Sequence, residues 1–288
     1  MTGAPMAAVG KVTEAAPVPR LGPAHYARCL AGIVRREALR WVHQRSRFVS
    51  ALVRPLVWLG VFAAGFRFVL GVSIIPPYDT YIPYEVYIAP GLIAMILLFQ
   101  GMQSSLSMVY DREMGSMRLL MVSPLPRWFL LTAKLIAGTI VSIVQAYIFL
   151  AIAWFWEIEP PVWGYVAVLP ALALSGLMLG ALGLVLSSFI RQLENFAGVM
   201  NFVIFPMFFA SSALYPLWHV KEASLTLYWI CQVNPFSHAT ELVRFALYGQ
   251  VDWLAAGIVV AFLVIFMALA VYGYDPGRGL VQRRGGAE

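Results

Sequence analysis

The side chains best suited to recognise another molecule lie in a charged connection at residues 111–134, which reads DREMGSMRLLMVSPLPRWFLLTAK between two apolar segments. Glu113, Gly115 and Ser116 form a compact acidic turn, and a run compatible with a helix follows it. Proline at position 124 ends that run, because proline lacks the backbone donor and clashes with the preceding turn. The pattern predicts a short helix that offers charged groups to a soluble protein. The predicted contact residues are Asp111, Arg112, Glu113, Gly115, Ser116, Arg118, Pro124 and Arg127.

A second polar group of residues comes where Asn234 and Pro235 interrupt residues 218–252. This region is too polar to cross a membrane and too apolar for a free loop, which predicts two short helices, 221–233 and 236–248, that re-enter the outer leaflet and are buried in protein. Asn234 is expected to cap the second helix. Glu241 and Arg244 share one helical face, so both a structural ion pair and contact with a substrate are open.

The sequence contains no enzyme motif. Its four histidines never occur at a metal-ligand spacing, and no G-x-S-x-G element is present. The single Gly-Lys pair, Gly10 and Lys11, lacks the rest of a phosphate-binding loop. Cys29 and Cys231 are far apart and fit no redox spacing. We therefore expect no catalytic residues, no metal and no cofactor bound by this chain.

The elements that must position these residues are membrane helices. Of 288 residues, 61% are hydrophobic and 12% are charged, whereas roughly 25% are charged in soluble domains. A spanning helix needs about 20 mostly apolar residues. The expected fold is an all-α membrane protein with six transmembrane helices. The predicted spans are at about residues 48–75, 87–110, 131–156, 164–190, 196–217 and 253–274.

The first predicted span carries Arg54 and Arg67. They lie ~20 Å apart along a helix, so each side chain is able to extend toward an opposite interface. The fourth span carries Gly176, Gly180 and Gly183, a small-residue stripe that allows close helix packing.

The segments outside the spans have distinct compositions. Residues 1–23 are rich in Ala, Pro and Gly and are expected to be disordered. Residues 24–47 alternate apolar and arginine positions and predict an amphipathic interfacial helix, with a simple basic anchor as the alternative. Residues 48–275 form the transmembrane domain, and residues 276–288 form a cytoplasmic tail.

The basic residues predict the orientation. Of the 20 Lys and Arg residues, all but Arg67, Lys221 and Arg244 fall on one side of the predicted spans. The richer side is expected to be cytoplasmic, with both chain termini inside. This asymmetry explains the net charge of +6 better than nucleic-acid binding does, so we expect the lipid bilayer and no nucleic acid as a partner.

Three landmarks in fixed order resemble the permease subunits of type-2 ABC exporters, whose members export drugs, lipo-oligosaccharides and polysaccharides. They are the basic amphipathic helix, the D-R-E-M-G-S-M-R-L-L…S-P-L-P-R connection, and the N-P-F-S-H-A-T-E-L-V-R stretch before the last span. The run at residues 71–91, GVSIIPPYDTYIPYEVYIAPG, is similar to the subgroup associated with pyrroloquinoline-quinone-dependent alcohol oxidation.

The resemblance implies a half-transporter in the bacterial inner membrane. Two copies of the chain would form the pathway, and a separate cytosolic ATPase subunit would bind ATP and Mg. Residues 111–127 would be the coupling helix, and residues 234–244 would belong to an external gate. The alternatives are an ATPase-independent channel or carrier and a non-transporting membrane assembly subunit. The substrate (an alcohol-related compound, drug, lipid or glycan), the direction of transport, a homomeric or heteromeric dimer, and substrate contact by Glu241 and Arg244 are left open.

Overall fold

The structure is a computed structural model that describes residues 22–43, 45–66, 76–78, 81–113, 125–190 and 192–274. These parts of the chain are predominantly helical, as expected for an all-α protein. The helices are α1 (Pro23–His43), α2 (Arg45–Phe66), α3 (Tyr84–Glu113), α5 (Arg127–Ala153), the 3-10 turn η1 (Trp154–Trp156), α6 (Val162–Phe189), α7 (Leu193–Phe209), α8 (Leu217–Ala223), α9 (Leu225–Val233), α10 (Pro235–Leu247) and α11 (Trp253–Gly273).

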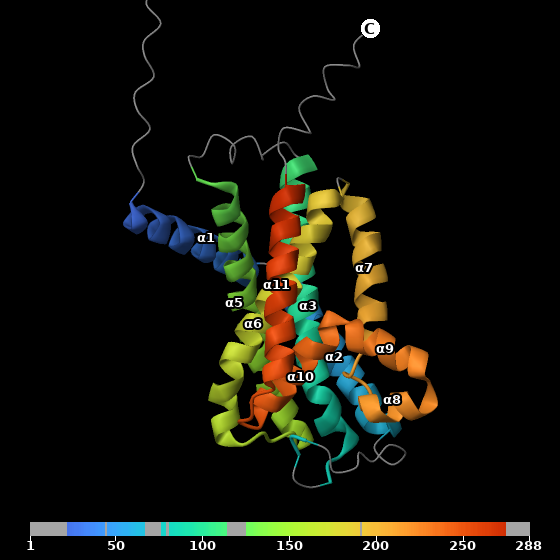
Figure 1. The fold of residues 1–288 in the computed structure, drawn as a ribbon. Coiled ribbons are helices and arrows are strands. Elements are labelled where there is room, and N and C mark those ends of the chain that lie inside the picture. Colours follow the sequence, from blue (N-terminus) through green and yellow to red (C-terminus); the bar gives the residue numbers. More distant parts are fainter. Residues whose placement is uncertain are drawn as a thin grey trace, which may run out of the picture.

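Four helices of the described chain are long and apolar enough to cross a membrane: α3, α5 with η1, α6 and α11. They run side by side along the long axis of the bundle (Figure 1), and α3 and α6 form its most extensive contact. The chain is therefore a multi-pass membrane protein. The other two predicted spans fall on shorter apolar helices, Val49–Phe62 within α2 and Leu193–Phe209. The count of six spans stays a prediction.

Glycines allow α3 and α6 to touch through their backbones. A Cβ atom placed on Gly101 would lie 2.7 Å from the Cα atom of Gly180. One placed on Gly183 would lie 2.9 Å from the carbonyl oxygen of Gly101, and one on Gly176 would lie 2.9 Å from Thr139 on α5. The stripe predicted from the sequence thus lies in a contact within one subunit, where small residues permit close approach.

We predict that Gly101→Ala destabilises the bundle by about 1–3 kcal/mol, because the added methyl group meets the backbone of α6 rather than a flexible side chain. Gly257→Ala on α11 is the matched control, since nothing lies within 4 Å of a Cβ atom at that position. The measurement is the thermal unfolding midpoint in detergent. Equal midpoints for the two variants would contradict the inferred contact.

Helix α1 packs across α5 (Figure 1). The rings of Tyr26 and Phe129 meet edge to face at 5.0 Å, and none of the residues of α1 is fully buried. The predicted amphipathic helix at 24–47 therefore begins near the expected position, and the described helix ends at His43. Both predicted tails fall largely or wholly outside the described residues.

Arg54 turns toward the bundle. Its guanidinium lies 3.8 Å from the centroid of the Phe99 ring on α3, a cation–π contact. The sequence had allowed this side chain to extend to an interface, and the aromatic face of α3 gives it a partner inside the fold instead. Arg67 lies outside the described residues.

The segment before α11 contains three helices, so the prediction of one helix over residues 221–233 is wrong. Ser224 separates α8 from α9 with extended backbone angles, φ −158 and ψ 114. Its hydroxyl accepts a hydrogen bond from the Leu227 amide at 3.4 Å. Serine favours such caps because its side chain competes for nearby backbone groups. The cap predicted at Asn234 is confirmed, since its side-chain oxygen accepts from the Phe236 amide at 3.0 Å.

The helix ends divide between two faces of the molecule. The end of α3, the start of α5, the α6–α7 turn and the end of α11 lie together, at the top of Figure 1, and η1 and the α10–α11 turn lie at the opposite end.

We predict that cysteines at Thr80 and Glu159 react with a membrane-impermeant maleimide in intact cells, whereas cysteines at Ser116 and Gly279 do not, because basic residues stay inside. Reaction of the Ser116 variant from outside would reverse the orientation.

Candidate functional site

A largely buried polar group, which we name the outer cluster because the basic residues predict that this end of the molecule faces outward, lies where α3 and α10 meet the α7–α8 connection. It consists of Tyr78, Tyr87, Ser212, Glu241 and Arg244. Arg244 is its centre: the residue is 2% exposed, and it is the largest fully buried side chain in the described part of the protein. A buried arginine persists in a fold only when partners satisfy its charge and its donors. The partners of Arg244 therefore define what the cluster does.

Arg244 has three kinds of partner. Its Nη1 group donates to Glu241 on the preceding helical turn, so the pair that the sequence left open is present. Its Nη2 group donates to the Ser212 carbonyl at 2.8 Å and to the Tyr87 carbonyl at 3.5 Å. Its guanidinium also lies 4.2 Å from the centroid of the Tyr87 ring. One side chain thus joins α10 to α3 and to the α7–α8 connection.

The α7–α8 connection needs these donors, because residues 210–216 are not helical. Backbone carbonyls at membrane depth are tolerated only where the protein satisfies them. The Tyr87 hydroxyl donates to the Ser212 carbonyl at 3.0 Å, and the Tyr84 hydroxyl donates to the Leu214 carbonyl at 2.6 Å. Asn234 donates to the carbonyls of Met207 and Ala210, each at 2.7 Å. Asn234 therefore caps α10 and also holds the end of α7.

The phenols around Arg244 do not carry charge at neutral pH. Burial raises the pKa of Tyr78 far above its ordinary value, although the positive charge of Arg244 opposes that shift. Burial likewise raises the pKa of Tyr248 to about 12, and the two rings meet edge to face at 4.8 Å. Within the described residues, the Tyr78 hydroxyl and the Arg244 Nε atom have no hydrogen-bond partner. The cluster thus retains unused hydrogen-bonding capacity that water or another arrangement of the helices would satisfy.

The described residues among those predicted to contact a soluble protein lie at the other end of the molecule (Figure 1). Asp111, Arg112 and Glu113 are the last residues of α3, and Arg127 begins α5. The remaining predicted contacts lie outside the described residues: Gly115, Ser116, Arg118 and Pro124.

Glu113 links this end of α3 to α7. Its Oε2 atom accepts a hydrogen bond from the Leu193 amide, the first of α7, at 3.3 Å, while the N-cap residue Gln192 makes no side-chain cap of its own. A carboxylate suits this position because the first amides of a helix are unpaired and carry partial positive charge. Glu113 therefore belongs to the predicted coupling segment and also contacts the start of α7, whose other end leads into the outer cluster.

Tyr78, Tyr84, Tyr87 and Ser212 were not among the site residues predicted from the sequence. The available signal was the tyrosine-rich run before and within α3, where Tyr84 and Tyr87 are three residues apart and share a helical face. Nothing in the local sequence marks Ser212 as the acceptor for Arg244, because that contact is made through its backbone carbonyl.

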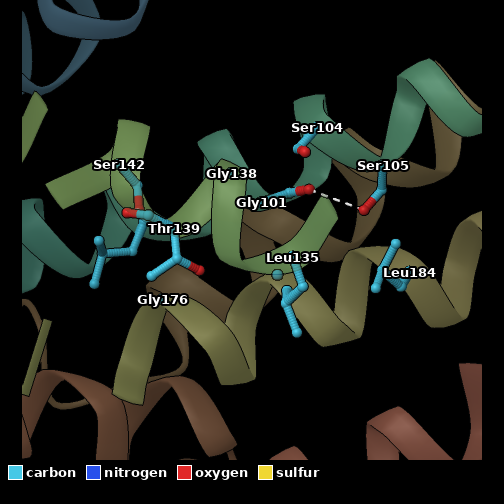
Figure 2. A pocket seen from close by; sticks show the side chains of 11 residues that line it. Gly101, Ser104, Ser105, Leu135, Gly138, Thr139, Ser142, Gly176 and Leu184 are labelled. Atoms are coloured by element: carbon cyan, nitrogen blue, oxygen red, sulfur yellow. Dashed lines mark hydrogen bonds between the residues drawn. The ribbon is translucent and has the colours of Figure 1, made fainter. Parts of the chain in front are cut away.

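The described helices leave a small cavity and a larger one between them. The first, of about 10 Å³, is lined by glycines, serines, leucines and Thr139 from α3, α5 and α6. Figure 2 shows Ser104 and Ser105 on one side of it and Thr139 and Ser142 on another, with Ser105 donating to the Gly101 carbonyl at 3.0 Å. This volume holds at most one water molecule, so the space is a feature of helix packing. The second cavity, of about 50 Å³, lies between α1, α3 and α5.

Among the described residues, no group of three or more His, Cys, Asp or Glu side chains is placed to hold a metal ion.

The sequence comparisons point to one group of proteins. A family model described as ABC-2 type transporter matches residues 29–248, a range that contains both residues 111–127 and residues 234–244. The chain is 33% identical over 170 residues to the Escherichia coli K12 protein named "Probable multidrug ABC transporter permease YbhR", which covers 58% of this chain and 45% of that protein. It is 25% identical over 233 residues to "Putative transport permease ycf38" of Porphyra purpurea, which covers 78% of this chain and 75% of that protein.

A third relative is "Nodulation protein J" of Rhizobium leguminosarum bv. viciae, 31% identical over 104 residues, with 33% of this chain and 39% of that protein aligned. The chain thus spans less than half the length of YbhR, and about three quarters of the ycf38 protein.

Proposed function

Because this chain belongs to the ABC-2 type transporter family, we propose that it forms the translocation pathway of an ATP-driven exporter as a dimer, with a separate cytosolic ATPase as its motor. The transport permease role itself follows from the family and from the permease names of its relatives. Permeases of this kind are not themselves enzymes, so ATP and Mg would bind the partner subunit. The observation that carries the proposal is the family match, which runs through both the charged connection and the re-entrant region.

The proposed coupling element is the segment at residues 111–127, which contributes Asp111, Arg112, Glu113, Gly115, Ser116, Arg118, Pro124 and Arg127. The contact between Glu113 and the first amide of α7 supports this role. A displacement of the coupling segment would move the start of α7 through the contact between Glu113 and Leu193. Helix α7 would carry that movement to its other end, where Arg244 binds the α7–α8 connection. Both ends of α7 are thus tied to residues that the sequence marked, and this gives a physical route between the two faces.

The proposed gate is the outer cluster with Asn234 and Pro235. Here α10 lies between α3, α6 and α11 and seals the outer end of the bundle. Opening requires Arg244 to exchange partners, and the Arg244 Nε atom and the Tyr78 hydroxyl, which have no hydrogen-bond partner among the described residues, offer groups for a second arrangement. ATP binding changes the equilibrium between the inward-open and outward-open states only if the ATP-bound ATPase binds these two states with different affinity.

The proposed membrane arrangement has six spans, including α2 and α7, in the bacterial inner membrane with both termini in the cytoplasm. The substrate class is a proposal as well. The name of YbhR refers to multiple drugs, which makes drug-like amphiphiles the first compounds to test.

The direct experiment is affinity purification of the tagged chain from the cells that produce it. We expect a P-loop ATPase to co-purify, and we expect the reconstituted complex to hydrolyse ATP and to move fluorescent drug-like cations into inside-out vesicles. Transport without an ATPase would assign the chain to the channel or carrier class. An ATPase that co-purifies without any ATP-dependent transport would favour an assembly subunit.

A further inference from the structure

The larger cavity, between α1, α3 and α5, has a polar lining that neither the coupling segment nor the outer cluster uses. Its volume is about 50 Å³. Glu37 and Arg40 line it from α1, Gln100 and Gln103 from α3, and Gln145 from α5. A water molecule requires about 10–15 Å³ of such volume, so the space accepts a fragment of several heavy atoms.

Glu37 and Arg40 form the charged side of the cavity, and Arg36, outside its lining, pairs with the same carboxylate, so the three side chains together carry one net positive charge. Glu37 Oε1 lies 3.0 Å from Arg36 Nη2 and 3.3 Å from Arg40 Nη1, so one carboxylate sits between two guanidinium groups. The side chain of Glu37 is 12% exposed, whereas that of Arg40 is 34% exposed. The donors of Arg40 that Glu37 does not use remain available to an anionic group, and arginine is well suited to phosphate.

The deep side of the cavity has an unsatisfied acceptor. Gln145 is 1% exposed, and its Oε1 atom has no hydrogen-bond partner within the described ranges. Leaving a buried acceptor unpaired is unfavourable, and such groups are rare in folded proteins. Gln145 therefore indicates a missing hydrogen-bond donor. A phosphate diester has no donor to offer, whereas a hydroxyl group both donates and accepts.

We propose that this cavity binds the hydroxylated head group of an anionic membrane lipid. The hydroxyl groups donate to Gln145 and exchange hydrogen bonds with Gln100 and Gln103, while the phosphate lies beside Arg40. The single net positive charge of Arg36, Glu37 and Arg40 together matches the single negative charge of a phosphate diester. The site is a feature of one chain, so it stands whether or not an ATPase drives transport.

The test is native mass spectrometry of the detergent-purified full chain, titrated with lipids. Phosphatidylglycerol carries a phosphate diester and two hydroxyls, whereas the head group of phosphatidylcholine has no hydrogen-bond donor. We expect phosphatidylglycerol to bind at least about ten-fold more tightly, a difference of about 1.4 kcal/mol. Gln145→Leu should abolish that preference, and Gln250→Leu, at an exposed glutamine in the α10–α11 turn, should retain it.

Two further measurements test the phosphate contact and the need for acyl chains. Arg40→Gln should weaken phosphatidylglycerol binding even if Gln145→Leu fails to fold, because it removes the phosphate contact and not the glutamine. Soluble glycerol 3-phosphate should not compete, since it lacks the acyl chains that hold a lipid beside α1. Equal binding of the two lipids, an unchanged preference in Gln145→Leu, unchanged phosphatidylglycerol affinity in Arg40→Gln, or full competition by glycerol 3-phosphate would overturn the proposal. The first two results would leave the cavity as a water-filled space.

Discussion

Arg244→Gln is expected to destabilise the folded protein by about 3 kcal/mol or more, the range seen when one partner of a buried ion pair is removed. The change removes the donors to the Ser212 and Tyr87 carbonyls and leaves Glu241 beside a neutral group. The measurement is the unfolding midpoint and the monodisperse yield in detergent. Arg28→Gln is the control, because Arg28 is exposed on α1 and its effect should remain within about 0.5 kcal/mol.

A double-mutant cycle with Glu241 separates the ion pair from the backbone contacts. Glu241→Gln should cost less than Arg244→Gln, because Arg244 would keep the Ser212 and Tyr87 carbonyls and the Tyr87 ring. The double variant should cost less than the sum of the two single changes, since each single change leaves one uncompensated charge. Strictly additive losses would mean that the two residues act separately.

Glu113→Arg is expected to lower ATPase binding, or the ATP hydrolysis that binding supports, on the order of ten-fold or more. The substitution places a cation against the amides that begin α7, where an anion is favourable. It also reverses the charge of the proposed coupling segment, where a like-charge contact is unfavourable. The measurement is pull-down of the ATPase together with ATP turnover, with membrane insertion followed in parallel.

Glu113→Gln is the matched control, because the amide oxygen still accepts a hydrogen bond from the Leu193 amide. If the cap of α7 is the important contact, this variant keeps most of the activity. If the negative charge is important, it loses activity with little change in stability. Normal pull-down and normal turnover in Glu113→Arg would remove residues 111–127 from the proposed coupling role.

Local sequence patterns predicted the helices and pairs of the candidate site. The contacts between these helices could not be predicted, because they join residues that are far apart in the sequence. Asn234 and Pro235 identified the start of α10, because an Asn cap and a proline at the first turn are both local signals. The spacing of Glu241 and Arg244 likewise placed the pair on one face. The link from Arg244 to Ser212 was not predictable, since it depends on the place where α7 stops and on the tyrosines of α3.

The same distinction applies to the other regions. The stripe at Gly176, Gly180 and Gly183 predicted close packing, but not that Gly101 would be its partner on α3. The helix break at Ser224 was not predicted, because no proline or glycine marks it between residues 217 and 233. The contact between Glu113 and Leu193 joins residues 80 positions apart, and three glutamines from two helices line a single cavity only in the folded bundle.

Movement of the outer region during ATP turnover is the most direct test of the central claim, and Cys231 on α9 supplies a native reporter. Its thiol is free and 0% exposed, and burial raises its pKa, so reaction with a maleimide should be slow at rest. In a Cys29→Ser background of the purified complex in nanodiscs, we predict faster labelling of Cys231 with ATP than with ADP or no nucleotide. A cysteine introduced at the exposed Gln250, with both native cysteines replaced, should label at one rate throughout. Equal Cys231 rates in all conditions, while the bound ATPase hydrolyses ATP, would contradict the claim that the ATPase drives this chain.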